Sequence, residues 1–218
     1  MRNKILAVVV TYQPENTLRK HLQAIREQIS SVVVVDNGST NIKAIELAAS
    51  ITGCRLVRNE ANLGIAHALN QGAAIAMAEG FTWFATFDQD SEVTPGMVSG
   101  LLATYDAHPM KDQIGVLVAF HRDRDTGGNY DDQRDVISDS EDWMLLRTTI
   151  TSGSLISIST LHAVGAFDNT LFIDFVDHDF YMRCRQRGFL IVGAKHQVLI
   201  HSIGRTTLHH LFGKRVIC

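Results

Sequence analysis

The sequence predicts one α/β domain in which helices cover both faces of a mostly parallel sheet. Short apolar runs alternate with amphipathic stretches of helical length from residue 5 to residue 120. These runs are continuously apolar, which is typical of strands buried on both faces of a parallel sheet. Polar turn residues or glycines follow several of them abruptly. Together, these features predict a doubly wound α/β sheet.

The first half of the chain supplies the parallel strands and their connecting helices. Residues 5–11 form the first predicted strand, and Pro14 suits the first turn of the helix that follows. Leu18, Leu22 and Ile25 then recur at helical spacing. The other predicted elements are strands at 32–35, 55–57, 81–87 and 114–120 and helices at 42–49, 65–79 and 94–105.

The second half is less regular. From His121 to Asp142 the chain is polar and acidic and has no periodicity, which predicts a lid or a disordered insert. Further on, Ser159 and Thr160 are predicted to cap a short helix. The other predicted elements are strands at 144–150, 155–158, 189–192 and 198–200 and a helix at 174–187.

The composition is that of an ordinary folded domain. The 218 residues can bury a substantial core, and 45% hydrophobic with 20% charged residues is usual for a globular protein. A net charge of -3 argues against a nucleic-acid binder, which would carry a basic stripe. Three widely spaced cysteines give no disulfide or zinc framework. Because no signal peptide precedes the first strand and no run could span a bilayer, we predict a cytoplasmic protein.

Two carboxylates, Asp88 and Asp90, come directly after the apolar run at 81–87. They would lie past the carboxyl end of a buried strand, where open α/β sheets bind their ligands. Two adjacent carboxylates repel each other, and a hard divalent cation that carries a phosphate would relieve the repulsion. The alternative is a plain surface turn, in which Asp is common. We take this Asp-x-Asp motif as the centre of the predicted site.

Other turns offer weaker candidates. Asp36 ends the second predicted strand, and its alternative role is a simple helix N-cap. Asn62 and Gly64 open a helix whose N-terminal amides suit an anion, although they also suit an ordinary loop-to-helix turn. Trp143 is either a core residue or a platform on which a sugar stacks.

Three acids, Asp174, Asp177 and Asp179, lie around the start of the last predicted helix. They could serve catalysis, but helix capping and the helix dipole favour acids at the same positions. Asp179 is spaced to pair with Arg183 one helical turn later. His201 follows an apolar strand and is either a metal ligand or a histidine held by a backbone partner.

The order of these motifs resembles the inverting glycosyltransferases of family 2, which have the GT-A fold. The resemblance covers nearly the whole chain, and within the family the chain looks most like bacterial rhamnosyltransferases. The matching segments are residues 8–12 (VVVTY), 35–39 (VDNGS), 59–64 (NEANLG), 87–91 (FDQDS), 165–168 (GAFD), 174–179 (DFVDHD) with Arg183, and His201.

The resemblance implies a role for each matched residue. Asp90 would ligate Mg²⁺ or Mn²⁺, and His201 would be an additional metal ligand. Asp177 would be the general base that deprotonates the acceptor hydroxyl. Val176 stands where many relatives carry Glu, so the local alignment could shift by one or two positions. The residues implied in nucleotide binding are Thr11, Tyr12, Asp36, Asn62, Gly64 and Asp88.

The resemblance also implies a mostly parallel GT-A sheet with a small antiparallel acceptor-side region. Residues 1–120 would form the nucleotide-sugar-binding half, and residues 121–218 would form the acceptor-side and catalytic half of the same domain. Because relatives commonly extend further, we expect that the chain could be a C-terminally truncated form.

The implied activity is transfer of L-rhamnose from dTDP-rhamnose, or of a sugar from another dTDP- or UDP-linked donor. The implied acceptor is a glycan or polyprenyl-linked molecule in the synthesis of O-antigen or another cell-surface polysaccharide. The work would take place at the inner membrane face, where the basic tail after Gly204 could touch anionic lipid. The alternatives are a nucleotide-sugar-binding protein without efficient transfer and a sugar nucleotidyltransferase. The latter would need a Gly-rich basic loop after the first strand, and residues 11–15 are neither.

Overall fold

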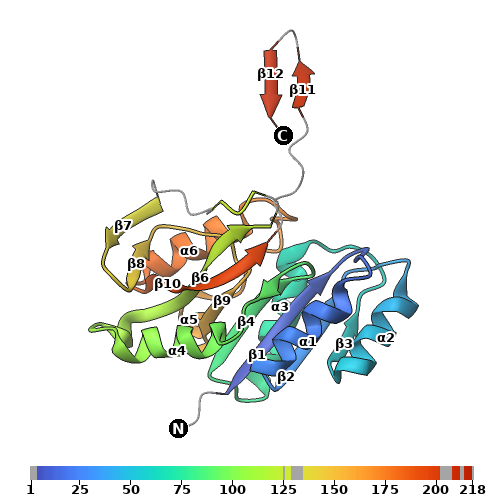
Figure 1. Ribbon diagram of the computed structural model, residues 1–218, viewed down its shortest axis with the longest axis horizontal. Coiled ribbons are helices and arrows are strands. Elements are labelled where there is room, and N and C mark those ends of the chain that lie inside the picture. The colour runs from blue at the N-terminus through green and yellow to red at the C-terminus, as the bar shows by residue number, and fades with distance from the viewer. Residues whose placement is uncertain (1–3, 125, 129–134, 202–207, 212–213, 218) are drawn as a thin grey trace.

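The computed structural model describes residues 4–124, 126–128, 135–201, 208–211 and 214–217, the last two ranges through their backbone. Its main element is a ten-stranded sheet with the strand order β3-β2-β1-β4-β9-β6-β10-β8-β7 and with β5 paired to β10 (Figure 1). The strands are β1 (Ile5–Thr11), β2 (Ser31–Asp36), β3 (Arg55–Arg58), β4 (Trp83–Asp88), β5 (Glu92–Val93), β6 (Ile114–Asp123), β7 (Val136–Asp139), β8 (Trp143–Leu146), β9 (Ser154–Ser157) and β10 (Leu190–His201).

The pairing confirms a mostly parallel core with an antiparallel region beside it. Strands β1 to β4 pair in parallel, and so do β6 and β10. Strand β9 runs antiparallel between β4 and β6, and β8 and β7 add antiparallel strands at the edge. A separate two-stranded sheet pairs β11 (Leu208–Leu211) with β12 (Lys214–Ile217). The main sheet therefore runs continuously through both predicted halves of the chain.

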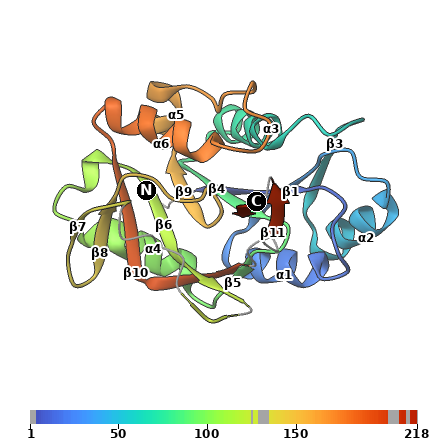
Figure 2. The same cartoon turned by 90° about the horizontal axis from the view of Figure 1, so that it is seen from above.

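Helices cover both faces of the sheet (Figure 2). Helices α3, α5 and α6 lie on one face, and α1, α2 and α4 lie on the other. The bounds are α1 (Leu18–Gln28), α2 (Ile42–Thr52), α3 (Ile65–Ala78), α4 (Met97–Ala107), the 3₁₀ turn η1 (Lys111–Gln113), α5 (Ile158–Val164) and α6 (Val176–Gln186). This arrangement is the doubly wound pattern that the sequence predicts.

The core explains why the strands are continuously apolar. In β1, Ala7 and Val9 pack into the cluster under α1, α2 and α4, whereas Leu6 and Val8 pack into the cluster under α3, α5 and α6. All four side chains are at least 98% buried. Each fully buried Val or Leu side chain is worth about 1.5–3 kcal/mol of transfer free energy. Both faces of the strand therefore hold the sheet between its helical layers.

The chain departs from the predicted elements at its first turn. The helix predicted to begin near Pro14 begins at Leu18. Residues 12–17 instead form a turn in which Gln13 has a positive φ of 48°. The Gln13 amide donates to Ser39 Oγ, and the Asn41 side chain donates to the Pro14 carbonyl. These contacts hold the turn against the loop after β2, so the prediction at Pro14 is wrong.

Three predictions in the second half also need correction. Residues 121–123 are not an insert, because β6 continues through them in register with Leu199, Ile200 and His201 of β10. Strand β7 lies within the same predicted insert. The strands predicted at 189–192 and 198–200 are one strand, β10, with an irregularity between Ala194 and Val198. The cap of α5 is Ser157, whose Oγ accepts the Thr160 amide.

Among the described residues, none of the helices combines the length and the apolar character that crossing a bilayer requires. The predicted lipid contact of the basic tail rests on side chains after residue 201, which lie outside the described side chains.

Candidate active site

The carboxyl ends of β1, β2 and β4 and the end of β10 surround a cavity of about 580 Å³, which we call the strand-end cavity. Its position follows from the parallel pairing, which brings the carboxyl ends of β1, β2 and β4 to one edge of the sheet. Its lining residues are Val10, Tyr12, Glu15, Thr17, Asn37, Asn62, Gly64, Ile65, Asp88, Gln89, Asp90, Arg124, Phe172, Ile173 and His201.

Asp88, Asp90 and His201 form a cluster in this cavity. One ligand atom from each of the three lies within 4.8 Å of the others. His201 Nε2 is 3.8 Å from Asp88 Oδ2, and His201 Nδ1 is 3.5 Å from Asp90 Oδ1. The carboxylates come from the end of β4 and the imidazole from the end of β10, two strands that β9 and β6 separate in the sheet.

The cluster has the chemistry of a divalent-cation site. His201 Nδ1 is buried and makes no hydrogen bond with a described residue, so an orphaned ligand atom points into the cluster. Burial raises the pKa of Asp88, and the neighbouring carboxylates of Asp90 and Asp177 raise it further against the opposing effect of His201. Two carboxylates and one imidazole suit Mg²⁺ or Mn²⁺, whose charge would offset this repulsion. The residues present therefore fit the predicted metal.

The turn between the two carboxylates is fixed from both sides by Gln89. Its side-chain Oε1 accepts a hydrogen bond from the Tyr12 amide at 2.8 Å, which ties the turn to the end of β1. Its carbonyl lies 3.0 Å from Nδ1 of the buried His21 on α1. Behind the turn, the hydroxyls of Ser91 and Ser152 both accept from the Asp88 amide. The acidic side chains thus project from a rigid turn.

A network of side-chain amides shapes the opposite wall. Asn37, directly after β2, donates to Asn62 Oδ1 at 2.8 Å. Its own Oδ1 accepts from Asn59 Nδ2 at 3.0 Å and from the Leu63 amide at 3.1 Å. Asn59 in turn exchanges two hydrogen bonds with Gln71 of α3. The network holds the loop at 59–64 against the end of β2.

Gly64 lines the cavity at the start of α3 and has a positive φ of 87°. A Cβ atom there would lie 2.6 Å from the Phe172 carbonyl oxygen, so the segment around Phe172 approaches the helix closely. That carbonyl accepts the Ile65 amide at 2.8 Å. The first amide of α3 therefore already has a protein partner, and the anion role predicted for Asn62 and Gly64 stays a prediction.

Two predicted nucleotide-binding residues lie behind the cavity wall. Asp36 is fully buried, and both of its carboxylate oxygens accept the Ser39 amide at 3.3 Å. Thr11 is also fully buried, and its Oγ1 makes no hydrogen bond with a described residue. Tyr12, by contrast, is 46% exposed and lines the cavity. Contact of Asp36 or Thr11 with a nucleobase stays a prediction that needs the wall to move.

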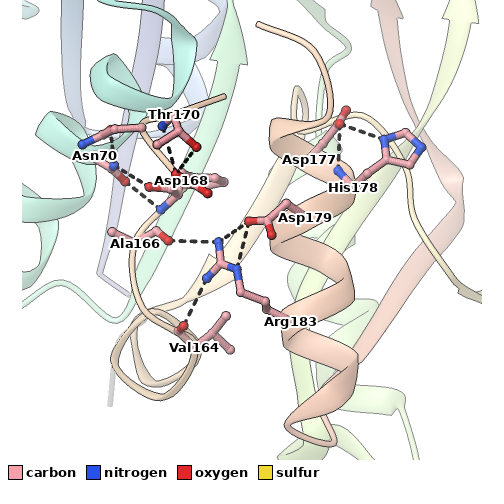
Figure 3. A network of polar contacts seen from close by, with 11 residues as sticks. Asn70, Val164, Ala166, Asp168, Thr170, Asp177, His178, Asp179 and Arg183 are labelled. Carbon is pink, nitrogen blue, oxygen red and sulfur yellow. Dashed lines mark hydrogen bonds and ion pairs between the residues drawn. The ribbon is translucent and has the colours of Figure 1, made fainter. Parts of the chain in front are cut away.

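Asp177, the predicted general base, lies in the first turn of α6 (Figure 3). Its Oδ1 accepts from the His178 amide at 2.8 Å and lies 3.0 Å from His178 Nδ1. Its side chain is 21% exposed, so a substrate hydroxyl could reach the carboxylate. Its negative charge contributes to the raised pKa of Asp88, so the two carboxylates interact electrostatically.

Asp179 has the structural role that its spacing predicts (Figure 3). Its Oδ2 accepts from Nε and Nη2 of Arg183 at 2.9 and 2.7 Å. The same guanidinium donates to the carbonyls of Val164, the last residue of α5, and of Ala166, just after the helix. The pair therefore fixes α6 against the α5 end and so orients the helix that carries Asp177.

A second cavity of about 480 Å³, the α6 cavity, lies beside this helix. Its wall includes Phe175, which is 68% exposed and has a positive φ of 64°. Such a backbone is strained for an aromatic residue, and strain of this kind gathers at functional sites. His178 also lines this cavity and is hydrogen-bonded to Asp177. The full lining is Arg147, Thr148, Asp168, Leu171, Phe175, His178, Asp179, Met182 and Arg185.

The sequence reasoning missed several residues of the strand-end cavity. Asn37 and Gln89 lay inside recognised motifs, but only the fold shows which backbone groups they hold. Arg124 gave no signal, because it lies in the polar stretch that we interpreted as an insert. Trp143 lines neither of these two cavities and packs in the core against His108, with ring centroids 4.3 Å apart.

Known proteins are similar to this chain in sequence and in architecture. The model of "Glycosyl transferase family 2" matches residues 6–167. A dTDP-rhamnosyl transferase, RfbF of Shigella flexneri, is 32% identical over 214 residues, which cover 94% of this chain and 71% of that protein.

Solved structures show the same fold. GalNAc-T7 with UDP, GalNAc and Mn²⁺ superposes with a TM-score of 0.70 over 91% of this chain, at 16% identity. S. aureus TarS 1–349 in complex with UDP-GlcNAc also gives 0.70, over 94% of this chain and at 16% identity. The chain spans 44% of the former and 60% of the latter. The GT-A fold is thus confirmed, and since the family model covers most of the sequence and a dTDP-rhamnosyl transferase matches nearly all of it, the chain belongs to glycosyltransferase family 2.

Proposed function

We propose that this glycosyltransferase is metal-dependent and inverting and that it transfers L-rhamnose from dTDP-rhamnose. The observation that carries the proposal is the cluster of Asp88, Asp90 and His201 in a cavity at the strand ends. Its size, about 580 Å³, lies in the range of small-molecule sites. The similarity to a dTDP-rhamnosyl transferase supports this donor, and UDP-linked sugars, which occupy the TarS neighbour, are the other candidates.

In this proposal the nucleoside lies toward Tyr12 and the diphosphate lies toward the acidic cluster. Tyr12 offers an exposed ring at the end of β1, and Gln89 fixes the spacing between that ring and the carboxylates. Asp90 and His201 would hold Mg²⁺ or Mn²⁺, and Asp88 lies close enough to share the task. The bound cation would act as a Lewis acid that stabilises charge on the departing diphosphate.

Asp177 is the proposed general base. It would accept the proton of the acceptor hydroxyl while that oxygen forms a bond to the anomeric carbon. The bond from this carbon to the diphosphate oxygen breaks, and its electron pair leaves with the nucleoside diphosphate. Two observations support the assignment: the carboxylate is accessible, and its contacts with the amide and the ring of His178 hold it in one orientation.

We place the acceptor on the α6 side, because one chain segment, residues 171–175, contributes lining residues to both the α6 cavity and the strand-end cavity. Phe172 and Ile173 line the strand-end cavity, whereas Leu171 and Phe175 line the α6 cavity. An exposed aromatic ring suits the apolar face of a sugar. We propose a glycan or polyprenyl-linked acceptor in cell-surface polysaccharide synthesis, and a cytoplasmic reaction at the inner membrane face.

The proposal is tested by donor hydrolysis, in which water replaces the unidentified acceptor. The purified protein is incubated with dTDP-L-rhamnose or UDP-GlcNAc and Mn²⁺, and released nucleotide is measured together with the anomer of the released sugar. We expect Mn²⁺-dependent release, faster from dTDP-L-rhamnose, with the anomer opposite to that of the donor. Binding of the donor without any release would instead identify a nucleotide-sugar-binding protein that does not transfer.

A further inference from the structure

Arg124 is bonded to the backbone of two residues of the acidic cluster. Its amide donates to the His201 carbonyl at 3.0 Å, which continues the pairing of β6 with β10. Its Nη2 donates to the Asp90 carbonyl at 2.7 Å. The guanidinium is therefore held beside the candidate metal ligands, and it lines the strand-end cavity.

Arg124 places a positive charge in a cavity that is also lined by acidic residues. Among the described lining residues, Arg124 is the only arginine or lysine, and the acids are Glu15, Asp88 and Asp90. The contact of the guanidinium with a carboxylate of the described residues is a long one, because Nε lies 3.9 Å from Glu92 Oε2. The Arg124 side chain is 35% exposed, so its remaining N–H groups can reach a ligand.

A divalent cation alone would not supply enough positive charge to neutralise both the two carboxylates and a bound diphosphate. The carboxylates of Asp88 and Asp90 would balance a charge of two, and a nucleoside diphosphate then brings several negative charges of its own. A guanidinium beside a metal ion is itself repelled unless an anion lies between them. A bound diphosphate explains both the need for further positive charge and the absence of repulsion, because its oxygens can bind the cation and the planar N–H donors of an arginine together.

We propose that Arg124 binds the diphosphate of the sugar donor and neutralises the charge that remains on it when the glycosidic bond breaks. This inference rests on the proposed function, since it assumes a nucleoside-diphosphate donor in the strand-end cavity. Arg124 touches the leaving group in this assignment and is therefore a catalytic residue. Its hydrogen bond to the Asp90 carbonyl aligns the guanidinium with the metal ligands before the donor arrives.

The test uses Arg124→Gln and Arg124→Lys and follows the binding of dTDP and UDP by calorimetry in the presence of Mn²⁺. Arg122→Gln is the matched control, because Arg122 is an exposed residue near the end of β6 that lines neither cavity. We expect Arg124→Gln to weaken nucleotide binding by about 10- to 100-fold, the range of a lost charge-assisted hydrogen bond. The Lys variant should recover part of the affinity because it keeps the charge but not the planar fork, and the Arg122→Gln control should bind like wild type.

Two further measurements on the same variants distinguish binding of the diphosphate by Arg124 from a purely structural role. They are the Mn²⁺ affinity without nucleotide, measured by electron paramagnetic resonance, and the thermal midpoint. The inference expects both to stay near the wild-type values in Arg124→Gln. It is overturned if nucleotide affinity is unchanged, or if Mn²⁺ affinity falls as much as nucleotide affinity does. Failure of the wild-type protein to bind either nucleotide would instead reject the proposed function itself.

Discussion

Nδ1 of His201 lies 3.5 Å from a carboxylate oxygen of Asp90 and forms no hydrogen bond with any described residue. A buried ring nitrogen normally finds a partner, because leaving it unpaired costs free energy. The imidazole ring lies between two carboxylates, with Nδ1 toward Asp90 and Nε2 toward Asp88, and a cation would give the buried nitrogen a partner. Without a cation, the carboxylates of the cluster repel each other. Metal binding should therefore raise the free energy of unfolding of the protein.

Asp90→Asn and His201→Gln should each lower Mn²⁺ affinity by at least about tenfold, because each removes a ligand of the cluster. Asp90→Asn should not lower the thermal midpoint of the metal-free protein, since it also removes a charge that opposes ionisation of Asp88. Mn²⁺ titration followed by electron paramagnetic resonance checks the affinity. The exposed Asp106, which does not line the strand-end cavity, provides the control Asp106→Asn. Wild-type Mn²⁺ affinity in Asp90→Asn would exclude this site.

Asp177→Asn should slow donor hydrolysis by about 10²- to 10⁴-fold, the usual contribution of a general base. Nucleotide affinity in Mn²⁺ should change little, because Asp177 does not line the strand-end cavity. Asp179→Asn should instead lower the thermal midpoint, since it breaks the pair with Arg183 that fixes α6. Rates from a nucleotide-release assay and midpoints from calorimetry separate the two effects. If Asp177→Asn hydrolyses the donor as fast as wild type, a neighbouring acid is the base.

Gly38→Ala should destabilise the protein and weaken nucleotide binding together. A Cβ at this position would lie 2.5 Å from the backbone of Ala61, in the loop that forms one cavity wall, and φ is 84°. Gly80→Ala is the matched control, because φ is similarly positive at 70° but nothing lies within 4 Å of the added atom. The control should cost only about 1–2 kcal/mol of backbone strain. Urea denaturation gives both free energies, and equal losses in the two variants would mean that the loop can move away.

His108 should make the protein less stable in mild acid. It is 97% buried and burial lowers its pKa, so the unfolded chain binds a proton at this residue at a higher pH than the folded protein does. Stability from this residue is therefore complete above the ordinary pKa of about 6.5 and is lost as the pH falls below it.

His108→Gln provides the comparison, because Gln can still accept the Met110 amide that His108 Nδ1 accepts. The loss in free energy of unfolding between about pH 7.5 and about pH 5 should be smaller in the variant than in wild type. Urea denaturation at the two pH values measures it. The contributions of all other residues are common to both proteins, so equal losses would show that His108 is protonated without cost in the fold.

Much of the fold could be predicted because local patterns reflect where each strand lies. The continuous apolar runs at 5–11 and 32–35 identify strands buried on both faces, and the structure places them side by side inside the sheet, between β3 and β4. Pro14 misled because its fixed φ suits a helix start, whereas side chains from the loop after β2 hold its segment as a turn. Such long-range contacts leave no local pattern.

In the site, too, residues with a local sequence pattern could be predicted, whereas residues placed by long-range contacts could not. Asp88 and Asp90 are adjacent in sequence and follow a strand, so the sequence alone marks them. The contact of Arg124 with Asp90 depends on β6 extending into a polar stretch and pairing with β10, which hydrophobic periodicity does not reveal. The burial of Asp36 behind the wall was equally invisible, because its motif looks the same whether the carboxylate faces the cavity or the Ser39 amide.

The central claim is that the acidic cluster binds a cation that in turn binds a nucleoside diphosphate. The most direct test is calorimetric titration of the wild-type protein with dTDP and with UDP, in Mn²⁺ and again after chelation of the metal. The account predicts that Mn²⁺ raises the affinity for at least one of the two nucleotides by about tenfold or more. Equal affinities with and without the metal would contradict it.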